Sequence, residues 1–233
     1  MSKGKLAKFA EMKTFPNVVQ PPFEEVFNKD FRLKGKWNRE FFNSSQSITL
    51  ELGCGKGEYT IGLAKLYRER NFLGVDIKGS RIWKGARQSN IDNMENVGFI
   101  RTRIDFIESF FDQDEIQEIW ITFPDPQPKK PLKRLTSSAF LNRYRNFLNK
   151  SGWVNLKTDS QELYEYTAAL VNFNQLNVEI QTNDLYNSGF DNEILSIKTY
   201  YENMWLNEGK KINYIRFNID SSNPIIEPPD EEE

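Results

Sequence analysis

The chain has no histidine and only one cysteine, Cys54, among its 233 residues. Without histidine, a nucleophilic serine or cysteine has no imidazole base, and no metal can be held by imidazole ligands. One cysteine can form neither an internal disulfide nor a cysteine-rich zinc site. These absences exclude the common hydrolytic triads and the usual zinc enzymes. They predict a protein without a metal that resides in a reducing compartment.

Long apolar runs are also missing. No stretch approaches the length of a membrane span, and the lysine-rich N-terminus lacks the apolar core of a signal peptide. The formal net charge is −2, so binding to nucleic acid would have to rest on local clusters of positive charge. We expect a soluble, cytoplasmic protein with no membrane partner, as a monomer or a homodimer.

The composition divides the chain into three parts. Residues 1–25 are polar and basic and predict a flexible arm, with the alternative that the arm orders on a substrate. Residues 26–220 predict a single domain, because 38% hydrophobic residues supply one core in a chain of this length. Residues 221–233 end in Asp230-Glu-Glu-Glu233 and predict an acidic, disordered tail.

Strand and helix patterns alternate from Ser47 onward. Predicted strands cover residues 47–51, 71–76, 98–102, 117–123 and 152–157. Predicted helices follow the first strand to about residue 68 and cover 80–93, 136–149 and 160–172, with a further helix inside 24–43. Residues 176–181 and 212–219 predict a terminal antiparallel pair. This order predicts an α/β fold, a doubly wound Rossmann-like sheet that is mostly parallel, with helices on both faces.

A glycine-rich segment, Glu51-Leu-Gly-Cys-Gly-Lys-Gly57, ends the first predicted strand and opens a helix. Its glycines permit a sharp turn and a close approach to a ligand. The spacing is one residue tighter than the dinucleotide fingerprint, and Glu51 would repel a pyrophosphate but can hold the ammonium of an amino-acid cofactor through water. Asp76, at the end of the next strand, can accept both ribose hydroxyls of an adenosine. Together they predict an S-adenosylmethionine site; the alternative is a ligand-free turn with a surface aspartate.

A second segment, Ile121-Thr-Phe-Pro-Asp-Pro-Gln-Pro-Lys-Lys130, ends the fourth predicted strand in a Pro-Asp-Pro turn. It fixes the carboxylate of Asp125 at the mouth of a strand. The basic residues that follow are Lys129, Lys130, Lys133 and Arg134. They suit the phosphates of a nucleic acid, with an ordinary solvated charge run as the alternative. The two segments predict an enzyme that holds an adenosine-containing cofactor and acts on nucleic acid.

With these motifs the chain resembles the bacterial tRNA (guanine-N7-)-methyltransferases, from about Lys5 to Ile219. The resemblance rests on Glu51-Leu-Gly-Cys-Gly-Lys-Gly57, Gly74-Val-Asp-Ile-Lys78, Phe123-Pro-Asp-Pro126 with Lys129-Lys130, Lys157-Thr-Asp159, and Thr199-Tyr-Tyr-Glu202. It implies a class I methyltransferase sheet, S-adenosylmethionine as the cofactor and tRNA as the partner. The implied reaction is in-line methyl transfer to guanine N7 in the variable loop of tRNA (nucleotide position 46).

The same resemblance implies the site residues. The cofactor-binding positions are Glu51, Gly53, Gly55, Asp76, Arg103, Ile104 and Asp125. The substrate-binding positions are Lys129, Asp159, Thr199, Tyr200, Tyr201 and Glu202. Asp125 is the implied catalytic residue, at the position where cofactor and guanine meet.

The sequence departs from the family pattern at three places. Gln127 stands where the family usually has tryptophan, and the basic run after Lys130 is short, Pro131-Leu-Lys-Arg134. Arg103 aligns with an acidic position near the adenine, and Asp105 follows two residues later. The adenine contact stays open between Arg103, Asp105 and the backbone at Ile104.

Methylation of guanine N7 fits a chain without histidine, because the N7 lone pair attacks a sulfonium methyl without losing a proton first. The enzyme has to align the reacting atoms and exclude water. Asp125 can accept hydrogen bonds from the guanine N1–H and exocyclic amine and favour the positive charge that develops on the purine. Asp159, at the end of the fifth predicted strand, can share this work; the alternative is a helix N-cap.

Three other functions remain open to the sequence. The same fold and cofactor can serve another RNA, a protein or a small molecule, although the basic loop and the Thr199–Glu202 match argue against this. An inactive RNA-binding relative is possible, because Gln127 and Arg103 depart from the pattern. A nucleotide-dependent dehydrogenase is disfavoured by the glycine spacing and the missing histidine.

Overall fold

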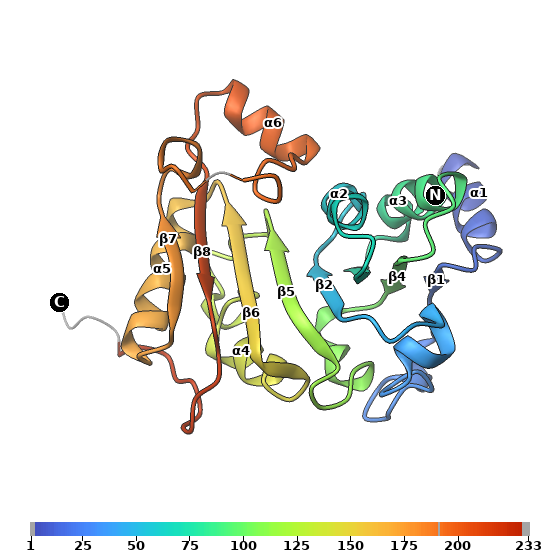
Figure 1. Ribbon diagram of the computed structural model, residues 1–233, viewed down its shortest axis with the longest axis horizontal. Coiled ribbons are helices and arrows are strands. Elements are labelled where there is room, and N and C mark those ends of the chain that lie inside the picture. Colours follow the sequence, from blue (N-terminus) through green and yellow to red (C-terminus); the bar gives the residue numbers. More distant parts are fainter. Residues whose placement is uncertain (1–2, 191, 230–233) are drawn as a thin grey trace.

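The computed structural model describes residues 3–190 and 192–229. These residues form an eight-stranded sheet in the order β1-β4-β3-β2-β5-β6-β8-β7 (Figure 1). The strands are β1 (Val18–Val19), β2 (Ile48–Leu52), β3 (Asn71–Asp76), β4 (Val97–Arg101), β5 (Ile116–Thr122), β6 (Leu148–Thr158), β7 (Val178–Thr182) and β8 (Asn213–Phe217). Strands β1 to β6 are parallel, and β8 runs antiparallel to both β6 and β7. The predicted fold class is confirmed.

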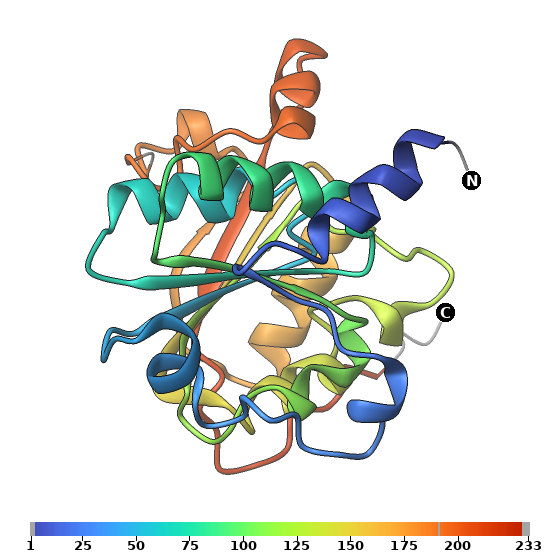
Figure 2. The ribbon, with the colours of Figure 1, turned by 90° about the vertical axis from the view of Figure 1, so that its right-hand side faces the viewer.

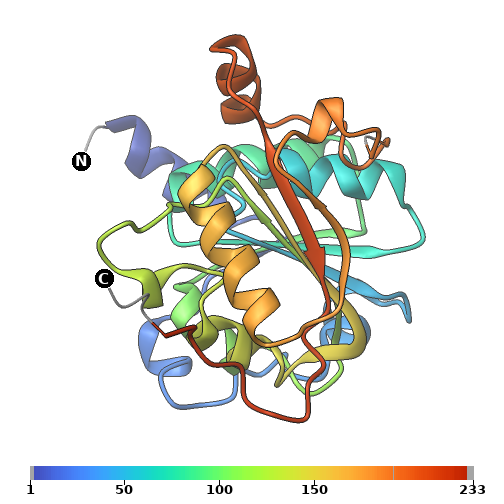
Figure 3. The same cartoon turned by 90° about the vertical axis from the view of Figure 1, so that its left-hand side faces the viewer.

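Helices cover both faces of this sheet (Figures 2 and 3). The α-helices are α1 (Lys3–Met12), α2 (Glu58–Leu66), α3 (Gly79–Ile91), α4 (Ser138–Tyr144), α5 (Gln161–Phe173) and α6 (Tyr200–Asn207). Side chains of α1, α2 and α3 form one buried cluster on one face, and those of α4 and α5 join another cluster on the other face. Helix α6 stands beyond the end of the sheet at which β5 and β6 finish (Figure 1).

The central strands form where the sequence predicts them because both of their faces are covered. Every residue of β2 and β3 is buried. In the parallel register, Leu50 lies opposite Leu73 on one side and Ile119 on the other. A parallel strand that is buried on both faces has an apolar sequence throughout, and such a run predicted each of these strands.

The segment 24–43 differs from the single helix that the sequence predicts. It contains a 3-10 turn, Phe23–Glu25, and a π-helix, Trp37–Phe42. Trp37 is fully buried, and its Nε1 donates a hydrogen bond to the carbonyl of Phe110 at 2.8 Å. Phe41 packs edge-on against Trp37, with ring centroids 5.2 Å apart. Aromatic packing under the sheet, rather than a regular helical period, therefore shapes this segment.

The N-terminal segment also differs from the flexible arm that the sequence predicts over residues 1–25. In its described part, α1 packs on α3, and β1 adds a short strand to β4. Met12 is buried, and the side-chain amide of Asn17 donates to Ser89 Oγ at 2.8 Å. These contacts explain why the N-terminal segment is ordered, because its apolar and polar side chains both contact α3. The division at residues 25 and 220 stays a prediction.

The described part of the predicted C-terminal tail, residues 221–229, also differs from a disordered tail. Ile225 is buried, and Glu227 accepts a hydrogen bond from Ser138 N at 2.8 Å. The acidic end 230–233 lies outside the described residues.

The part of the chain that the structure describes contains no helix long and apolar enough to cross a membrane.

Gly57 is expected to tolerate no side chain. Its φ is +71°, and an added Cβ would lie 2.6 Å from a ring carbon of Phe99, which is fully buried in β4. Left-handed backbone and overpacking together predict that Gly57→Ala lowers the free energy of unfolding by about 2–5 kcal/mol. Gly209→Ala is the matched control, because φ is +75° there but nothing lies within 4 Å. Urea unfolding that shows equal losses for both variants would contradict the packing argument.

Candidate active site

A cleft of about 460 Å³ opens at the carboxyl ends of β2, β3 and β4. Its lining includes Gly53, Asp76, Thr102, Ile104, Gln127 and Leu135. Ligands of open parallel sheets bind at this end of the strands. A larger hollow of about 970 Å³ lies at the other end of β6, between residues 142–150 and 219–224. None of the predicted site residues lines that hollow, so the cleft is the candidate active site.

The glycine loop closes over the end of β3. Gly53 and Cys54 both donate their backbone N–H groups to the carbonyl of Val75, at 2.8 and 3.0 Å. The three glycines of the loop have φ values of +79°, +55° and +71°, which explains why the sequence requires glycine at these positions. The loop therefore brings its backbone to the edge of the cleft without side chains in the way.

Asp76 braces this loop and also faces the cleft. Its Oδ2 accepts a hydrogen bond from Gly55 N at 3.0 Å, and its Oδ1 accepts one from Lys78 N at 2.7 Å. Asp76 is 8% exposed and lines the cleft. Because a carboxylate oxygen can accept more than one hydrogen bond, both oxygens keep capacity for a ligand hydroxyl. This arrangement suits the pair of ribose hydroxyls that the sequence predicts for the site.

Glu51 lies beneath the cleft rather than in its lining. The side chain is 2% exposed, and Oε2 accepts hydrogen bonds from the backbone N–H of Thr60 at 2.8 Å and from the Thr60 hydroxyl. Oε1 accepts from the Thr122 hydroxyl at 2.6 Å. The carboxylate thus joins β2 to α2 and β5. Burial raises the pKa of Glu51 to about 7, against the lowering effect of the hydrogen bonds from Thr122 and Thr60.

This shifted pKa predicts that stability falls as the pH rises from about 4.5 to about 7. The native state keeps the proton of Glu51 in that window, whereas the unfolded chain releases it near the ordinary value of 4.5, so unfolding becomes easier as the pH increases. The expected loss is on the order of 3 kcal/mol. Because the chain has no histidine, few other groups titrate there. Urea unfolding across this pH range should show a flatter profile for Glu51→Gln; identical profiles would contradict the assignment.

The Pro-Asp-Pro turn holds Asp125 out from the end of β5. Phe123, the first residue after β5, has a left-handed φ of +49°, and Gln127 has a φ of +47°. Phe123 N donates to the carbonyl of Lys157 at 2.8 Å, which ties the turn to β6. Asp125 is exposed, and its Oδ1 accepts a hydrogen bond from Gln127 N at 3.1 Å. Left-handed backbone at residues other than glycine is strained, and such strain is typical of functional turns.

Arg103, Ile104 and Asp105 share one wall of the cleft. Arg103 and Lys133 both pair with Asp105, at 3.1 and 3.5 Å. Burial alone would raise the pKa of Asp105, but the two cations outweigh it and lower the pKa below its ordinary value. The two side-chain candidates for the adenine contact, Arg103 and Asp105, thus form one ion pair in the same wall as Ile104. The structure brings both together with Asp76 in the lining of the cleft.

The basic loop after the turn divides into two kinds of residue. Lys130 and Lys133 line the cleft, and Lys129 is exposed outside it. Arg134, which the sequence assigns to the same basic loop, is only 4% exposed. It pairs with Glu162 and donates to the carbonyl of Pro126 at 2.9 Å. Arg134 therefore fixes the loop to α5, and its guanidinium is not presented to a phosphate.

Asp159 lies at the end of β6, half-buried, with Lys210 Nζ 3.8 Å from Oδ2. The alternative of a helix N-cap at Asp159 is wrong. Ser160 caps α5 instead, because its side chain accepts a hydrogen bond from Leu163 N at 3.2 Å. Asp159 is thus free of a capping role, and its place at a strand end beside the turn of Asp125 agrees with the sequence prediction.

The segment Thr199–Glu202 divides into buried and exposed residues. Thr199 caps α6, and Thr199 and Glu202 form a reciprocal capping box. Glu202 is fully buried and pairs with Lys157, whose Nζ lies 2.7 Å from Oε1. Tyr200 and Tyr201 are exposed on the first turn of α6. Of the four residues of this segment, only the two tyrosines therefore have side chains open to solvent.

Several residues of the site were not predicted from the sequence. Thr102, Leu135 and Phe140 line the cleft, and Leu135 and Phe140 supply apolar surface beside the polar edge of Asp76. Lys157 is buried without exposure, which requires a partner such as Glu202. A Thr-x-x-Glu pattern ahead of a helix is the signature of a capping box, so Thr199 and Glu202 carried a signal for their structural role. The described residues contain no group of side chains suited to a metal ion.

The fold is the one that class I methyltransferases share. Solved structures of such enzymes share this sheet, among them the 16S rRNA methyltransferase KamB. It matches with a TM-score of 0.61 and 12% sequence identity, covering 84% of this chain and 99% of that protein. A 30S ribosomal A1408 methyltransferase from an uncultured bacterium matches with a TM-score of 0.52 and 16% identity, covering 76% and 89% of the two chains. At these identities the likeness shows the fold alone.

Sequence comparison identifies the family. A family model described as "Putative methyltransferase" matches residues 45–215. A tRNA (guanine-N(7)-)-methyltransferase of Bacteroides thetaiotaomicron is 51% identical over 228 residues, covering 98% of this chain and 90% of that protein. Another, of Porphyromonas gingivalis, is 50% identical over 222 residues, covering 94% and 91%. The chain belongs to the tRNA (guanine-N(7)-)-methyltransferase family.

Proposed function

We propose that this protein transfers a methyl group from S-adenosylmethionine to N7 of a guanine in the variable loop of tRNA. The observation that carries the proposal is the cleft itself. Its lining includes Gly53 of the glycine loop, Asp76 at the end of β3, and Gln127, which lies two residues after Asp125 in the turn that follows β5. The names of the family's members support the substrate.

The residues of the cleft fit the proposed cofactor. Asp76 offers two carboxylate oxygens with remaining capacity for the ribose hydroxyls, and Leu135 and Phe140 offer apolar surface for the adenine. Arg103, Ile104 and Asp105 form the wall for the adenine edge, and Gly53 and Gly55 bring backbone close to the amino-acid end. When bound, S-adenosylmethionine would supply an electrophilic methyl group.

The chain's own residues then have to hold guanine in line with that methyl group. N7 attacks with its own lone pair, so no general base is needed before methyl transfer. Asp125 accepts from the N1–H and the amine of guanine, and its charge favours the positive purine that forms. Asp159 stands at the neighbouring strand end and assists in positioning. Lys129 and the exposed Tyr200 and Tyr201 contact the RNA around the target guanine.

Glu51 supports the site from below in this proposal, and Thr199 and Glu202 support it by fixing α6. Their carboxylates and hydroxyl are bonded inside the protein, so their contribution to ligand binding acts through the glycine loop and the tyrosines. The proposed partner is tRNA, the protein acts as a monomer or homodimer without a metal, and its place of action is the cytoplasm.

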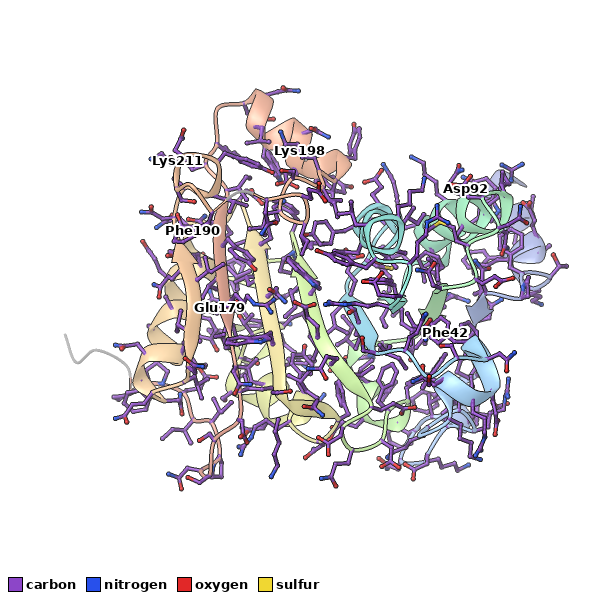
Figure 4. All side chains as sticks on the ribbon, viewed as in Figure 1. Phe42, Asp92, Glu179, Phe190, Lys198 and Lys211 are labelled. Atoms are coloured by element: carbon purple, nitrogen blue, oxygen red, sulfur yellow. The ribbon has the colours of Figure 1, made fainter. Side chains whose placement is uncertain are left out.

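Cofactor binding tests the first half of the proposal. Asp76→Ala should weaken binding of S-adenosylmethionine about 10–100-fold in titration calorimetry, because it removes acceptors of two hydrogen bonds to a charged group. Asp92→Ala is the matched control, since Asp92 caps the far end of α3 and pairs with Lys65 (Figure 4). Unchanged affinity in Asp76→Ala, or binding of a nicotinamide nucleotide in place of S-adenosylmethionine, would contradict the proposed cofactor site.

A further inference from the structure

In the part of the chain that the structure describes, two lysines at the base of α6 have no carboxylate partner. Lys56, inside the glycine loop, is half-buried, and its Nζ lies 4.0 Å from the ring centroid of Tyr200. Lys198, which precedes the Thr199 cap, is exposed, and its Nζ lies 4.8 Å from the ring centroid of Tyr186. Among the described residues, neither ammonium group forms an ion pair or a hydrogen bond. Figure 4 shows Lys198 beside α6.

Neighbouring cations on the same rim are neutralised, which sets these two apart. Lys84 Nζ lies 3.7 Å from Glu58, and Lys210 Nζ lies 3.8 Å from Asp159. The remaining oxygen of Glu58 accepts a hydrogen bond from Tyr200 N at 2.8 Å, so this carboxylate docks the first turn of α6 onto α2. Lys56 and Lys198 therefore supply positive charge at a place where Glu58 and Asp159 already have partners.

The aromatic rings beside the two ammonium groups hold them in place without neutralising their charge, so both can bind an anionic ligand. A lysine held over an aromatic ring gains a weak cation–π attraction and loses less side-chain freedom when it binds a ligand. Tyr200 packs edge-to-face with Tyr201 and is 56% exposed, so more than half of its surface stays open to solvent beside Lys56. An open ring next to a cation offers stacking to a base and charge to the backbone phosphate of the same strand.

We propose that Lys56, Lys198 and the ring of Tyr200 form a rim that binds the RNA backbone next to the target guanine. The inference rests on the proposed function for the identity of the RNA, and it adds Lys56 and Lys198 to the contacts with the substrate. The ligand of Lys56 is a phosphate of RNA rather than the carboxylate of the cofactor. Gly53 of the same loop lines the cleft, whereas Lys56 does not and extends over α6.

The salt dependence of tRNA binding tests this rim. Lys56→Met and Lys198→Met keep the length and the apolar stem of each side chain and remove the charge. Each should make the slope of log affinity against log salt shallower by about 0.7–0.9, and the double variant by about twice that amount. The tRNA KM of the double variant should rise about tenfold at physiological salt. Calorimetry should show an unchanged Kd for S-adenosylmethionine.

Two further variants are the controls. Lys56→Arg keeps a cation over the ring and should keep the wild-type slope. Lys65→Met removes a lysine from the opposite end of α2, where it pairs with Asp92, and should leave slope and KM unchanged. An unchanged slope in the double variant would overturn the proposal. A weaker Kd for S-adenosylmethionine with an unchanged slope would overturn it in favour of a contact between Lys56 and the cofactor carboxylate.

The outcome can be separated from that of the proposed reaction. If the wild-type protein methylates no guanine N7 in tRNA, while its RNA affinity still depends on Lys56 and Lys198, the reaction is refuted and the rim stands. If the wild-type protein methylates tRNA and the double variant keeps its slope, the reaction stands and the rim is refuted.

Discussion

Asp125→Asn is expected to reduce methyl transfer to tRNA by about 10²–10³-fold, with the loss in kcat. The substitution keeps the size of the side chain and its acceptor for Gln127 N, but it removes the negative charge that faces the positive purine. Because Asp125 is exposed and makes one hydrogen bond, we expect the melting temperature to stay within about 2 °C of wild type.

Single-turnover methyl transfer at saturating cofactor and tRNA is the measurement, since it separates the chemical step from binding. Asp220→Asn is the matched control, because Asp220 is an exposed aspartate at the other end of the sheet, beside the hollow that lacks site residues. Turnover of Asp125→Asn at the wild-type rate would remove the role given to this carboxylate. It would indicate that Asp159, at the end of β6, positions the guanine instead.

Glu202→Ala is expected to lower the free energy of unfolding by about 3–5 kcal/mol. Lys157 and Glu202 are both fully buried, and removal of the carboxylate leaves an ammonium group in the interior. Burial lowers the pKa of Lys157, and Glu202 acts against this by stabilising the charged form. Lys157 also donates to the carbonyl of Leu195 at 2.6 Å, so the pair holds the chain that leads into α6.

Urea unfolding of three proteins tests this pair: wild type, Glu202→Ala, and the double variant Lys157→Met with Glu202→Leu. The double variant should recover most of the lost stability, because a buried ion pair is often replaced by apolar residues at small cost. A double variant that is as unstable as Glu202→Ala would contradict the explanation through an unpaired charge. It would point instead to the hydrogen bonds of Lys157 with backbone carbonyls.

The sequence predicts well those elements that carry their own local pattern, above all strands whose two faces are both buried. Strand β3 has the predicted bounds 71–76, because an apolar run enters from a turn and ends at Asp76. The two-residue strand β1 and the helix α6 were not predicted. Strand β1 has no pattern of its own and exists through pairing with β4. Helix α6 has a short apolar face and depends on the buried pair of Lys157 and Glu202.

The site shows the same division. A carboxylate after a strand and glycines in a tight loop are local signals, so Asp76 and Gly53 could be predicted and lie in the cleft. Burial is a property of the whole fold, so the sequence could not show that Glu51 lies under the cleft, bonded to Thr60 and Thr122. The same holds for Arg134, whose positive charge indicated a phosphate contact, whereas in the fold its side chain is buried against α5 and pairs with Glu162.

Methyl transfer from labelled S-adenosylmethionine to tRNA that lacks 7-methylguanine tests the central claim most directly. The product RNA would be cleaved at 7-methylguanine and the cleavage site mapped. The proposed function predicts a single labelled guanine, in the variable loop. Transfer to a different atom or nucleotide, or no transfer to tRNA by a protein that binds the cofactor, would contradict it.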